Sequence, residues 1–315
     1  MPQKIVFCGQ MFIMKLMLAI SSLFLFVACK AQPQPKLSSG KDDNSLLWEI
    51  SGKGLKQPSY LFGTFHMMCK EDIQFSNNLL SAIQASKEVY FEMDLDDASN
   101  TLGAMFFMNM KDGKTLRDFF TAEEFLKLDT YFRDSLRTSL KTFQKMKPSF
   151  LEAFLYPKMM PCKNMSGVEQ ELLKIAAKDK KEIKGFETIA FQASVFDSIP
   201  YDVQAKSLLK TIDSIDAYKV QFDKMVKVYK TQQIDQLEAM FTDETFGIKD
   251  GLDVLLDKRN LNWVEQLKTI LPNNNIFMAV GAGHLVGKKG LIELLRKEGY
   301  QLRPIANDVM DVQKN

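Results

Sequence analysis

The sequence predicts an α/β fold with a mixed or parallel central sheet, βαβ units at both ends of the chain, and a large helical insertion or cap. Near both ends, short apolar runs of strand type alternate with segments of helical periodicity. Between them, apolar residues recur at helical spacing over long stretches. A chain of 315 residues that is 46% apolar and 25% charged can bury the core that such a fold requires.

Residues 1–29 predict a signal peptide with a lipobox. Lys15 precedes an uncharged apolar run, Leu16 to Val27, which is too short for a bilayer that needs ~20 residues. Phe26-Val-Ala-Cys29 resembles a bacterial lipobox, so we expect export and a lipid on Cys29 that anchors the protein to a bacterial membrane in the cell envelope. An ordinary signal peptide cut near Ala28, or a buried cysteine, is the alternative. Residues 30–44, rich in Pro, Gln, Ser and Lys, predict a flexible linker.

The folded domain, predicted for residues 45–310, opens with a β-hairpin. Leu46 to Ile50 and Tyr60 to Phe65 are aromatic and aliphatic runs separated by glycine and proline. Ser76 to Ser86 then has helical spacing, and Glu88 to Met93 is of strand type. Strand, helix and strand in this order predict a parallel βαβ unit.

Two helical insertions, at about residues 95–165 and 190–271, are predicted to form the cap. Between them, Gly167 to Asp179 predicts a helix and Glu182 to Phe186 a strand. After the second insertion the βαβ order returns as a strand, a glycine turn, a helix and a closing strand, at Ile276 to Val280, Gly281 to His284, Gly290 to Glu298 and Gln301 to Ile305.

The charge balance argues against one class of partner, and the cysteine content predicts a disulfide. The chain has 41 basic and 39 acidic residues, and two of the basic ones, Lys4 and Lys15, precede Cys29. The mature chain therefore carries no net formal charge, and no nucleic-acid partner is expected. Cys69 and Cys162 are the only cysteines after Cys29, and exported thiols can pair. We therefore predict a disulfide between them; two separate buried thiols are the alternative.

The chain holds two histidines, and both lie in the same local frame, Gly63-Thr-Phe-His66 and Gly281-Ala-Gly-His284. Each frame ends an apolar strand, and in parallel α/β sheets ligands lie at the carboxyl ends of the strands. Either imidazole alone would be interpreted as a structural residue. The repeated frame instead predicts that both bind one divalent metal, Zn, Mn or Co, beside an acidic ligand.

Three acidic residues at strand ends are candidates for this site. Glu92 and Asp94 lie two residues apart on one face of their strand. We prefer Glu92 as the third metal ligand and assign Asp94 to the substrate or to support of the ligands. Glu187 is a candidate ligand or general base. A helix cap or a lysine partner is the alternative for the first two, and a charge at a helix N-terminus for Glu187.

Arg259 and Asn260 lie in a helical stretch before Trp263. A bidentate Arg259 has the donors to hold a carboxylate ligand or a developing oxyanion, whereas a surface salt bridge is the alternative. Asn260, like Asp94, is expected either to contact the substrate or to hold the metal ligands in place. The sequence motifs of serine hydrolases, zincins, P-loop proteins and Cys-x-x-Cys redox proteins do not occur in the chain.

These residues lie in ordered blocks that resemble the TraB/GumN family, which includes the TIKI metalloproteases. The blocks are Tyr60-Leu-Phe-Gly-Thr-Phe-His66, Val89-Tyr-Phe-Glu-Met-Asp94, Lys184-Gly-Phe-Glu-Thr188 with Gln192, Arg259-Asn260 with Trp263, and Val280-Gly-Ala-Gly-His284 with Gly290. At Gly167-Val-Glu169 the family more often has Asp in the third position, so no role is carried onto Glu169.

The resemblance implies an α/β core with a helical insertion, a divalent-metal site built from both histidines and an acid, and hydrolysis of a peptide or protein substrate. We expect a metal-activated water to attack an amide carbonyl, with Arg259 stabilising the charge that develops and Glu187 moving the proton. The competing interpretation is a non-catalytic envelope lipoprotein that binds haem, iron or a peptide.

Overall fold

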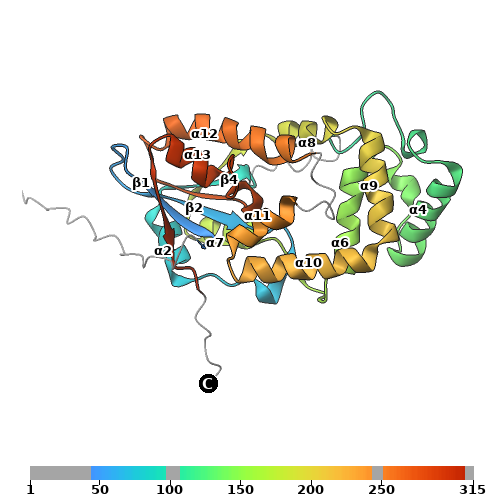
Figure 1. Cartoon of the computed structure of the whole chain (residues 1–315), viewed down its shortest axis with the longest axis horizontal. Coiled ribbons are helices and arrows are strands. Elements are labelled where there is room, and N and C mark those ends of the chain that lie inside the picture. Colours follow the sequence, from blue (N-terminus) through green and yellow to red (C-terminus); the bar gives the residue numbers. More distant parts are fainter. Residues whose placement is uncertain (1–43, 97–106, 243–250, 309–315) are drawn as a thin grey trace, which may run out of the picture. The chain divides into compact units, whose positions relative to one another are not determined.

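The computed structural model describes residues 44–96, 107–242 and 251–308, which all belong to one compact unit (Figure 1). The predicted signal peptide, the lipobox cysteine Cys29 and residues 30–43 of the predicted linker lie outside the described residues. The fold is therefore that of the predicted α/β domain.

A six-stranded mixed sheet in the order β6-β4-β7-β2-β1-β8 forms the centre of the fold. Its strands are β1 (Leu47–Ser51), β2 (Ser59–Thr64), β4 (Glu88–Met93), β6 (Glu182–Glu187), β7 (Ile276–Gly281) and β8 (Gln301–Ile305). Within the run β6-β4-β7-β2 all neighbours are parallel, whereas β1 is antiparallel to both β2 and β8. Every residue of β7 is buried, as expected for a central strand that is covered on both faces.

The predicted α/β class and the predicted hairpin are confirmed, since β1 and β2 pair antiparallel with Leu47 opposite Phe62. β2 and β4 run in the same direction, but they are not neighbours because β7 pairs with both. Phe277 of β7 lies opposite Tyr60 on one side and Val89 on the other. A strand from near the C-terminus thus enters the first βαβ unit, and it places the two histidine frames on adjacent strands.

Helices cover both faces of the sheet. In Figure 1, α12 (Lys258–Ile270) and α13 (Leu291–Lys297) lie on one side, and α2 (Asn77–Ala85) and α7 (Val168–Lys178) lie on the other. The sequence explains α2 directly: the Ser76 side chain accepts a hydrogen bond from the Leu79 N–H at its start. Its buried residues, Leu79, Ala82 and Ile83, recur at the spacing of one helix face.

Many of the helices between the strands pack around a second hydrophobic core, which includes Phe132, Leu155 and Leu208, whereas α7, α11 (Ile234–Thr242) and α12 pack against the core of the sheet. Among the described residues, the helices between β4 and β6 are η2 (Leu116–Asp118), α4 (Ala122–Ser135), η3 (Leu140–Phe143), α5 (Pro148–Leu151), η4 (Glu152–Leu155) and α6 (Tyr156–Met159), followed by α7. Those between β6 and β7 are α8 (Ile189–Asp197), α9 (Tyr201–Asp213), α10 (Ile215–Lys230), α11 (Ile234–Thr242) and the π-helical η7 (Asp253–Asp257), which leads into α12.

A short clip that was not predicted ties the first group of helices to the end of β2. β3 (Met68–Cys69) pairs antiparallel with β5 (Met165–Ser166) and is followed by η1 (Lys70–Asp72). Strands of two residues are too short to leave a periodic pattern in a sequence. The predicted disulfide between Cys69 and Cys162 is confirmed and lies beside this β3–β5 clip.

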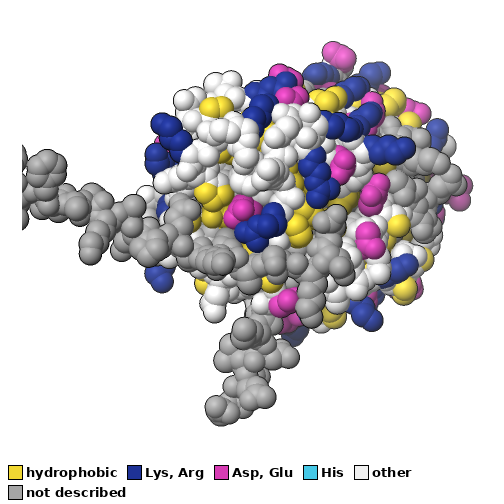
Figure 2. All heavy atoms as spheres, turned by 60° about the vertical axis from the view of Figure 1, so that its left-hand side comes forward, with side chains coloured by type: hydrophobic (Ala, Val, Ile, Leu, Met, Phe, Trp, Pro, Cys, Tyr) yellow, Lys and Arg dark blue, Asp and Glu magenta, His cyan; other side chains and the backbone are white. Residues whose placement is uncertain are grey.

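On the face shown in Figure 2, Lys and Arg side chains lie among Asp and Glu side chains. Within the described residues, no helix combines the length and the apolar character needed to cross a bilayer.

Candidate active site

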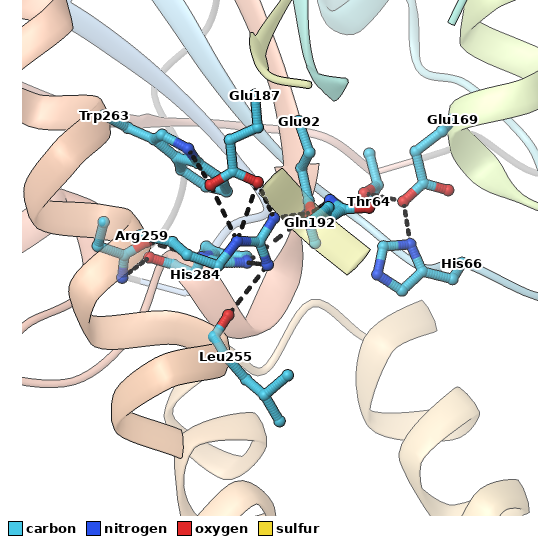
Figure 3. A network of polar contacts seen from close by, with 12 residues as sticks. Thr64, His66, Glu92, Glu169, Glu187, Gln192, Leu255, Arg259, Trp263 and His284 are labelled. Atoms are coloured by element: carbon cyan, nitrogen blue, oxygen red, sulfur yellow. Dashed lines mark hydrogen bonds and ion pairs between the residues drawn. The ribbon is translucent and has the colours of Figure 1, made fainter. Parts of the chain in front are cut away.

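Four neighbouring parallel strands end at one edge of the sheet, and each brings a polar side chain to it. His66 follows β2, Glu92 lies near the end of β4, Glu187 ends β6, and His284 ends η8 (Ala282–His284) directly after β7. Because the carboxyl ends of parallel strands share one edge, these side chains come together there (Figure 3).

His66 is held by a carboxylate that the sequence did not identify as part of the site. Glu169 Oε1 lies 2.7 Å from His66 Nδ1 and accepts a hydrogen bond from Thr64 Oγ1 at 2.5 Å. Gly167 permits this approach, because a Cβ there would lie 2.6 Å from the His66 carbonyl oxygen. The His66 side chain is 73% exposed and faces a cavity, so its Nε2 is accessible to a ligand.

The surroundings of His66 favour its protonated form. Loss of hydration next to the surrounding protein acts to lower the His66 pKa. The hydrogen bond and negative charge of Glu169, together with the charge of Glu92, outweigh this effect and raise the pKa to about 9. A cation at this position, whether a proton or a metal ion, is therefore stabilised by two carboxylates.

His284 is buried and fixed in one tautomer. Arg259 Nη1, which can only donate, lies 3.2 Å from His284 Nε2, so Nε2 carries the lone pair and Nδ1–H donates to Asn260 Oδ1 at 2.6 Å. Asn260 is held in turn, because its Nδ2 donates to the carbonyl oxygens of His284 and Lys289. Burial is the main cause that lowers the His284 pKa to about 3; Glu92 opposes this effect, and Arg259 and His66 add to it. The ring is neutral at physiological pH.

Glu92 connects the two histidines. Its Oε1 accepts a hydrogen bond from the Gly281 N–H at 2.8 Å and lies 3.7 Å from His284 Nε2. Its Oε2 accepts from Arg259 Nη2 at 2.6 Å and from Gln192 Nε2 at 3.1 Å. Burial acts to raise the Glu92 pKa, but the neighbouring imidazoles, Arg259 and the Gly281 N–H lower it below its usual range. Glu92 is therefore an ionised carboxylate with one oxygen directed at His284.

Arg259 is bound from several sides at the start of α12. Its Nε and Nη2 donate to Glu187 at 2.8–3.1 Å, and its Nη1 donates to the Leu255 carbonyl oxygen at 3.0 Å. Leu255 belongs to the π-helical η7, a type of turn that is often found at functional sites. The guanidinium is therefore fixed where it contacts Glu92 and His284 at once (Figure 3).

Glu187 and Asp94 do not face the cavity. The Glu187 side chain has no exposed surface, and its oxygens accept hydrogen bonds from Arg259 and from Trp263 Nε1 at 2.8 Å. Asp94 follows β4, and its neighbours Met93 and Leu95 line the cavity while Asp94 does not. The structure thus brings Glu92, Arg259, Asn260 and both histidines together and leaves Asp94 outside the cavity wall.

The donor set and the space beside it fit a divalent metal. Two imidazole nitrogens and a carboxylate oxygen are the ligands of many catalytic sites for Zn and related ions. A Cβ on Gly281 would lie 3.3 Å from Glu92 Oε1 and 3.4 Å from His66 Nε2, so glycine keeps the space between them open. The three donor atoms do not all lie within 4.8 Å of one another, and Arg259 Nη1 contacts His284 Nε2. Metal binding at His284 requires that this contact be released.

A cavity of about 700 Å³ opens onto these residues. Its polar end contains His66, Glu92, Glu169, Gln192, Arg259 and His284, whereas most of the remaining wall is apolar and aromatic. Cavities of this size and character hold small molecules or short peptide segments. Among the described residues, the one compact cluster of three metal-ligand side chains, Cys69, Glu71 and Cys162, contains the disulfide and offers no thiolate.

The chain is similar to known proteins over most of its length. The model of the TraB/PrgY/gumN family matches residues 46–304. Metalloprotease TIKI1 of Danio rerio is 24% identical, over 83% of this chain and 63% of the relative. Metalloprotease TIKI homolog of Nematostella vectensis is 22% identical, over 83% and 67%, and metalloprotease TIKI1 of Homo sapiens is 20% identical, over 87% and 63%. The chain thus spans just under two thirds of the zebrafish and human proteins. No solved structure matches it.

Proposed function

Because this chain belongs to the TraB/PrgY/gumN family, we propose that it is a metal-dependent hydrolase of the cell envelope that acts on peptides. The observation that carries the proposal is the paired anchoring of the imidazoles. Each Nδ1 is held by a side chain, so each Nε2 is the ring nitrogen that can bind a ligand, that of His284 once Arg259 releases it. The similarity to proteins named as metalloproteases supports the proposal.

His66 Nε2, His284 Nε2 and Glu92 Oε1 would hold the metal. A divalent ion in this position supplies a low-pKa water and polarises a substrate carbonyl. Glu169 and Asn260 keep the two rings in the orientation that such binding needs, because each accepts the Nδ1 proton. Gln192 and the Gly281 N–H hold Glu92 in the same way.

Arg259 is the residue placed to stabilise negative charge on the substrate. It lines the cavity, and on release from His284 its Nη1 has an N–H for a developing oxyanion. We assign Glu187 to holding Arg259 and not to moving a proton, since both its oxygens are engaged and it has no access to the cavity. Glu169, which lines the cavity and bonds to His66, is the better placed acid for proton transfer.

The envelope location rests on the N-terminal sequence. An apolar run that ends in Ala28-Cys29 supports export and lipidation, with residues 30–44 as the tether. Mass spectrometry of the N-terminal peptide from membranes tests this part of the proposal. A diacyl or triacyl group on Cys29 supports it, and a mature chain that begins at another residue contradicts it.

A binding protein is the second candidate, because the wall of the cavity is mostly apolar. Such a cavity also suits capture of haem, of a peptide or, through the histidines, of iron without turnover. Stoichiometric binding of one of these ligands, without peptide hydrolysis in the presence of any of the metals tested, would favour this function.

The central experiment measures metal and turnover together. Purified protein is analysed by mass spectrometry for bound metal, stripped with a chelator, reloaded with Zn, Mn or Co, and incubated with a peptide library. We expect about one ion per chain in the wild type, less in His66→Ala and His284→Ala, and metal-dependent cleavage. Glu123→Gln, on the exposed surface of α4, serves as the control. Undiminished cleavage in a chelator or in His66→Ala would refute the proposal.

A further inference from the structure

The cavity has a second acidic position that the proposed reaction does not use. Three glutamates line it: Glu92, Glu169 and Glu152. The first two belong to the histidine site, whereas Glu152 comes from η4 in the first group of helices. The residues that line the cavity near Glu152 in the sequence, Phe150, Tyr156 and Met159, are apolar or aromatic.

Glu152 has no basic partner within the part of the chain that the structure describes. Ser207 on α9 is the polar side chain that acts on its pKa, and no Lys, Arg or His charge does so. A carboxylate placed in an apolar wall loses hydration, and a protein seldom keeps one there without a compensating cation. Burial accordingly raises the Glu152 pKa to about 7, although the Ser207 hydrogen bond opposes this.

A series of aromatic rings joins Glu152 to the histidine site. Phe65, which precedes His66, contacts Phe222 with ring centroids 5.8 Å apart. Phe222 contacts Tyr156 at 6.1 Å, and the charge of Glu152 acts on Tyr156. These three rings line the same cavity. A ligand that spans them would have its polar end at His66 and its other end at Glu152.

We propose that Glu152 is a specificity residue that binds a positively charged group of the substrate, a lysine or arginine side chain or a chain-terminal amine. The aromatic rings would cover the apolar part of the substrate next to that group, and their faces also attract a cation. The inference rests on the proposed function, because it assumes that the substrate reaches both ends of the cavity. It adds the substrate class: peptides with a positive charge near the scissile bond.

The first test compares cleavage of matched peptides by the metal-loaded protein. Peptides cleaved in the library are resynthesised with norleucine for lysine and citrulline for arginine. We expect kcat/KM to fall on the order of ten-fold to a hundred-fold, mainly through KM, because a charge-assisted contact is lost. In Glu152→Gln the charged and neutral peptides should become equivalent, whereas Glu152→Asp should retain part of the preference. Glu123→Gln should behave as the wild type. An unchanged preference in Glu152→Gln would overturn the inference.

A second measurement separates this inference from the proposed function. Calorimetry at pH 8 compares binding of Nα-acetyl-lysine amide and Nα-acetyl-norleucine amide to the wild type and to Glu152→Gln. Tighter binding of the lysine probe in the wild type alone supports the role of Glu152, even when no peptide is hydrolysed and the proposed activity fails. Equal binding of both probes by the wild type overturns the inference, whatever the protein hydrolyses.

Discussion

Replacing Glu187 with glutamine should destabilise the protein strongly, although the change removes only one charge. The Glu187 side chain is fully buried, and the buried Arg259 donates to both of its oxygens. With glutamine at position 187, Arg259 keeps Glu92 as its one carboxylate partner. Part of its buried positive charge is then no longer balanced by a negative charge. Breaking a buried ion pair of this kind costs about 3–5 kcal/mol. For a domain of this size the melting temperature should fall by about 6–10 °C.

The assay is thermal unfolding of wild type and variant, followed by circular dichroism and calorimetry. Glu265→Gln is the matched control, because Glu265 forms an ion pair with Lys268 but its side chain is 69% exposed. That variant should melt close to the wild type, since solvent screens surface pairs. A melting temperature for Glu187→Gln within 2 °C of the wild type would show that the cluster does not hold α12 against the sheet.

Three further predictions concern the disulfide, His66 and Glu152. Replacing Cys69 and Cys162 with serine should cost about 4–5 kcal/mol in urea unfolding, because the bond closes a loop of 93 residues; an unchanged midpoint contradicts the entropic account. Glu169→Gln should weaken metal binding about 10–100-fold in a chelator competition, because His66 loses the carboxylate on Nδ1; equal affinity argues against this support. The pKa of Glu152 is raised to about 7 in the folded state from its ordinary value of 4.5, so its proton contributes stability that is fully present below pH 4.5 and is lost as the pH rises through 7. The free energy of unfolding of Glu152→Gln, relative to that of the wild type, should therefore rise between pH 5 and pH 8 by at most about 3 kcal/mol; a constant difference contradicts the raised pKa.

The sequence predicted the elements that carry strong periodic patterns. The hairpin, the α/β class and the pairing of the two cysteines are confirmed. The position of β7 between β2 and β4 was not predicted, because strand order depends on long-range packing and leaves no local pattern. Its continuous burial explains the result, since a fully apolar strand is most stable where neighbours cover both of its edges and both faces.

Within the candidate site, the residues in distinctive motifs could be predicted from the sequence. Residues whose role depends on a contact with a distant part of the chain could not. His66, His284 and Glu92 stand at strand ends, which sequence patterns can locate. Glu169 received no role because the TraB/GumN family more often has Asp at this position. Its place in the first turn of a helix, where acids are common, gave no independent signal. Its contact with His66 lies beside the β3–β5 clip, and two-residue strands cannot be recognised by alternation.

The clip also explains how the site is divided. His284, Asn260, Glu92 and Arg259 are buried and fixed by β4, β7 and α12, so this half of the site is part of the sheet core. The other half consists of His66 and Glu169, which lie on two segments that are held together by backbone hydrogen bonds. There the Val168 N–H donates to the Phe65 carbonyl oxygen, and the Lys70 N–H donates to that of Asn164.

The disulfide closes the far end of this second half, because Cys69 lies in β3 and Cys162 lies just before β5. Reduction should therefore loosen His66 and Glu169 while His284 and Glu92 keep their contacts. In an exported protein the oxidised bond would keep both halves together, so that His66 Nε2 stays beside the space that Gly281 leaves open. Metal affinity should accordingly fall on reduction before the fold is lost, and loss of both at the same reductant concentration would show that the two halves are one cooperative unit.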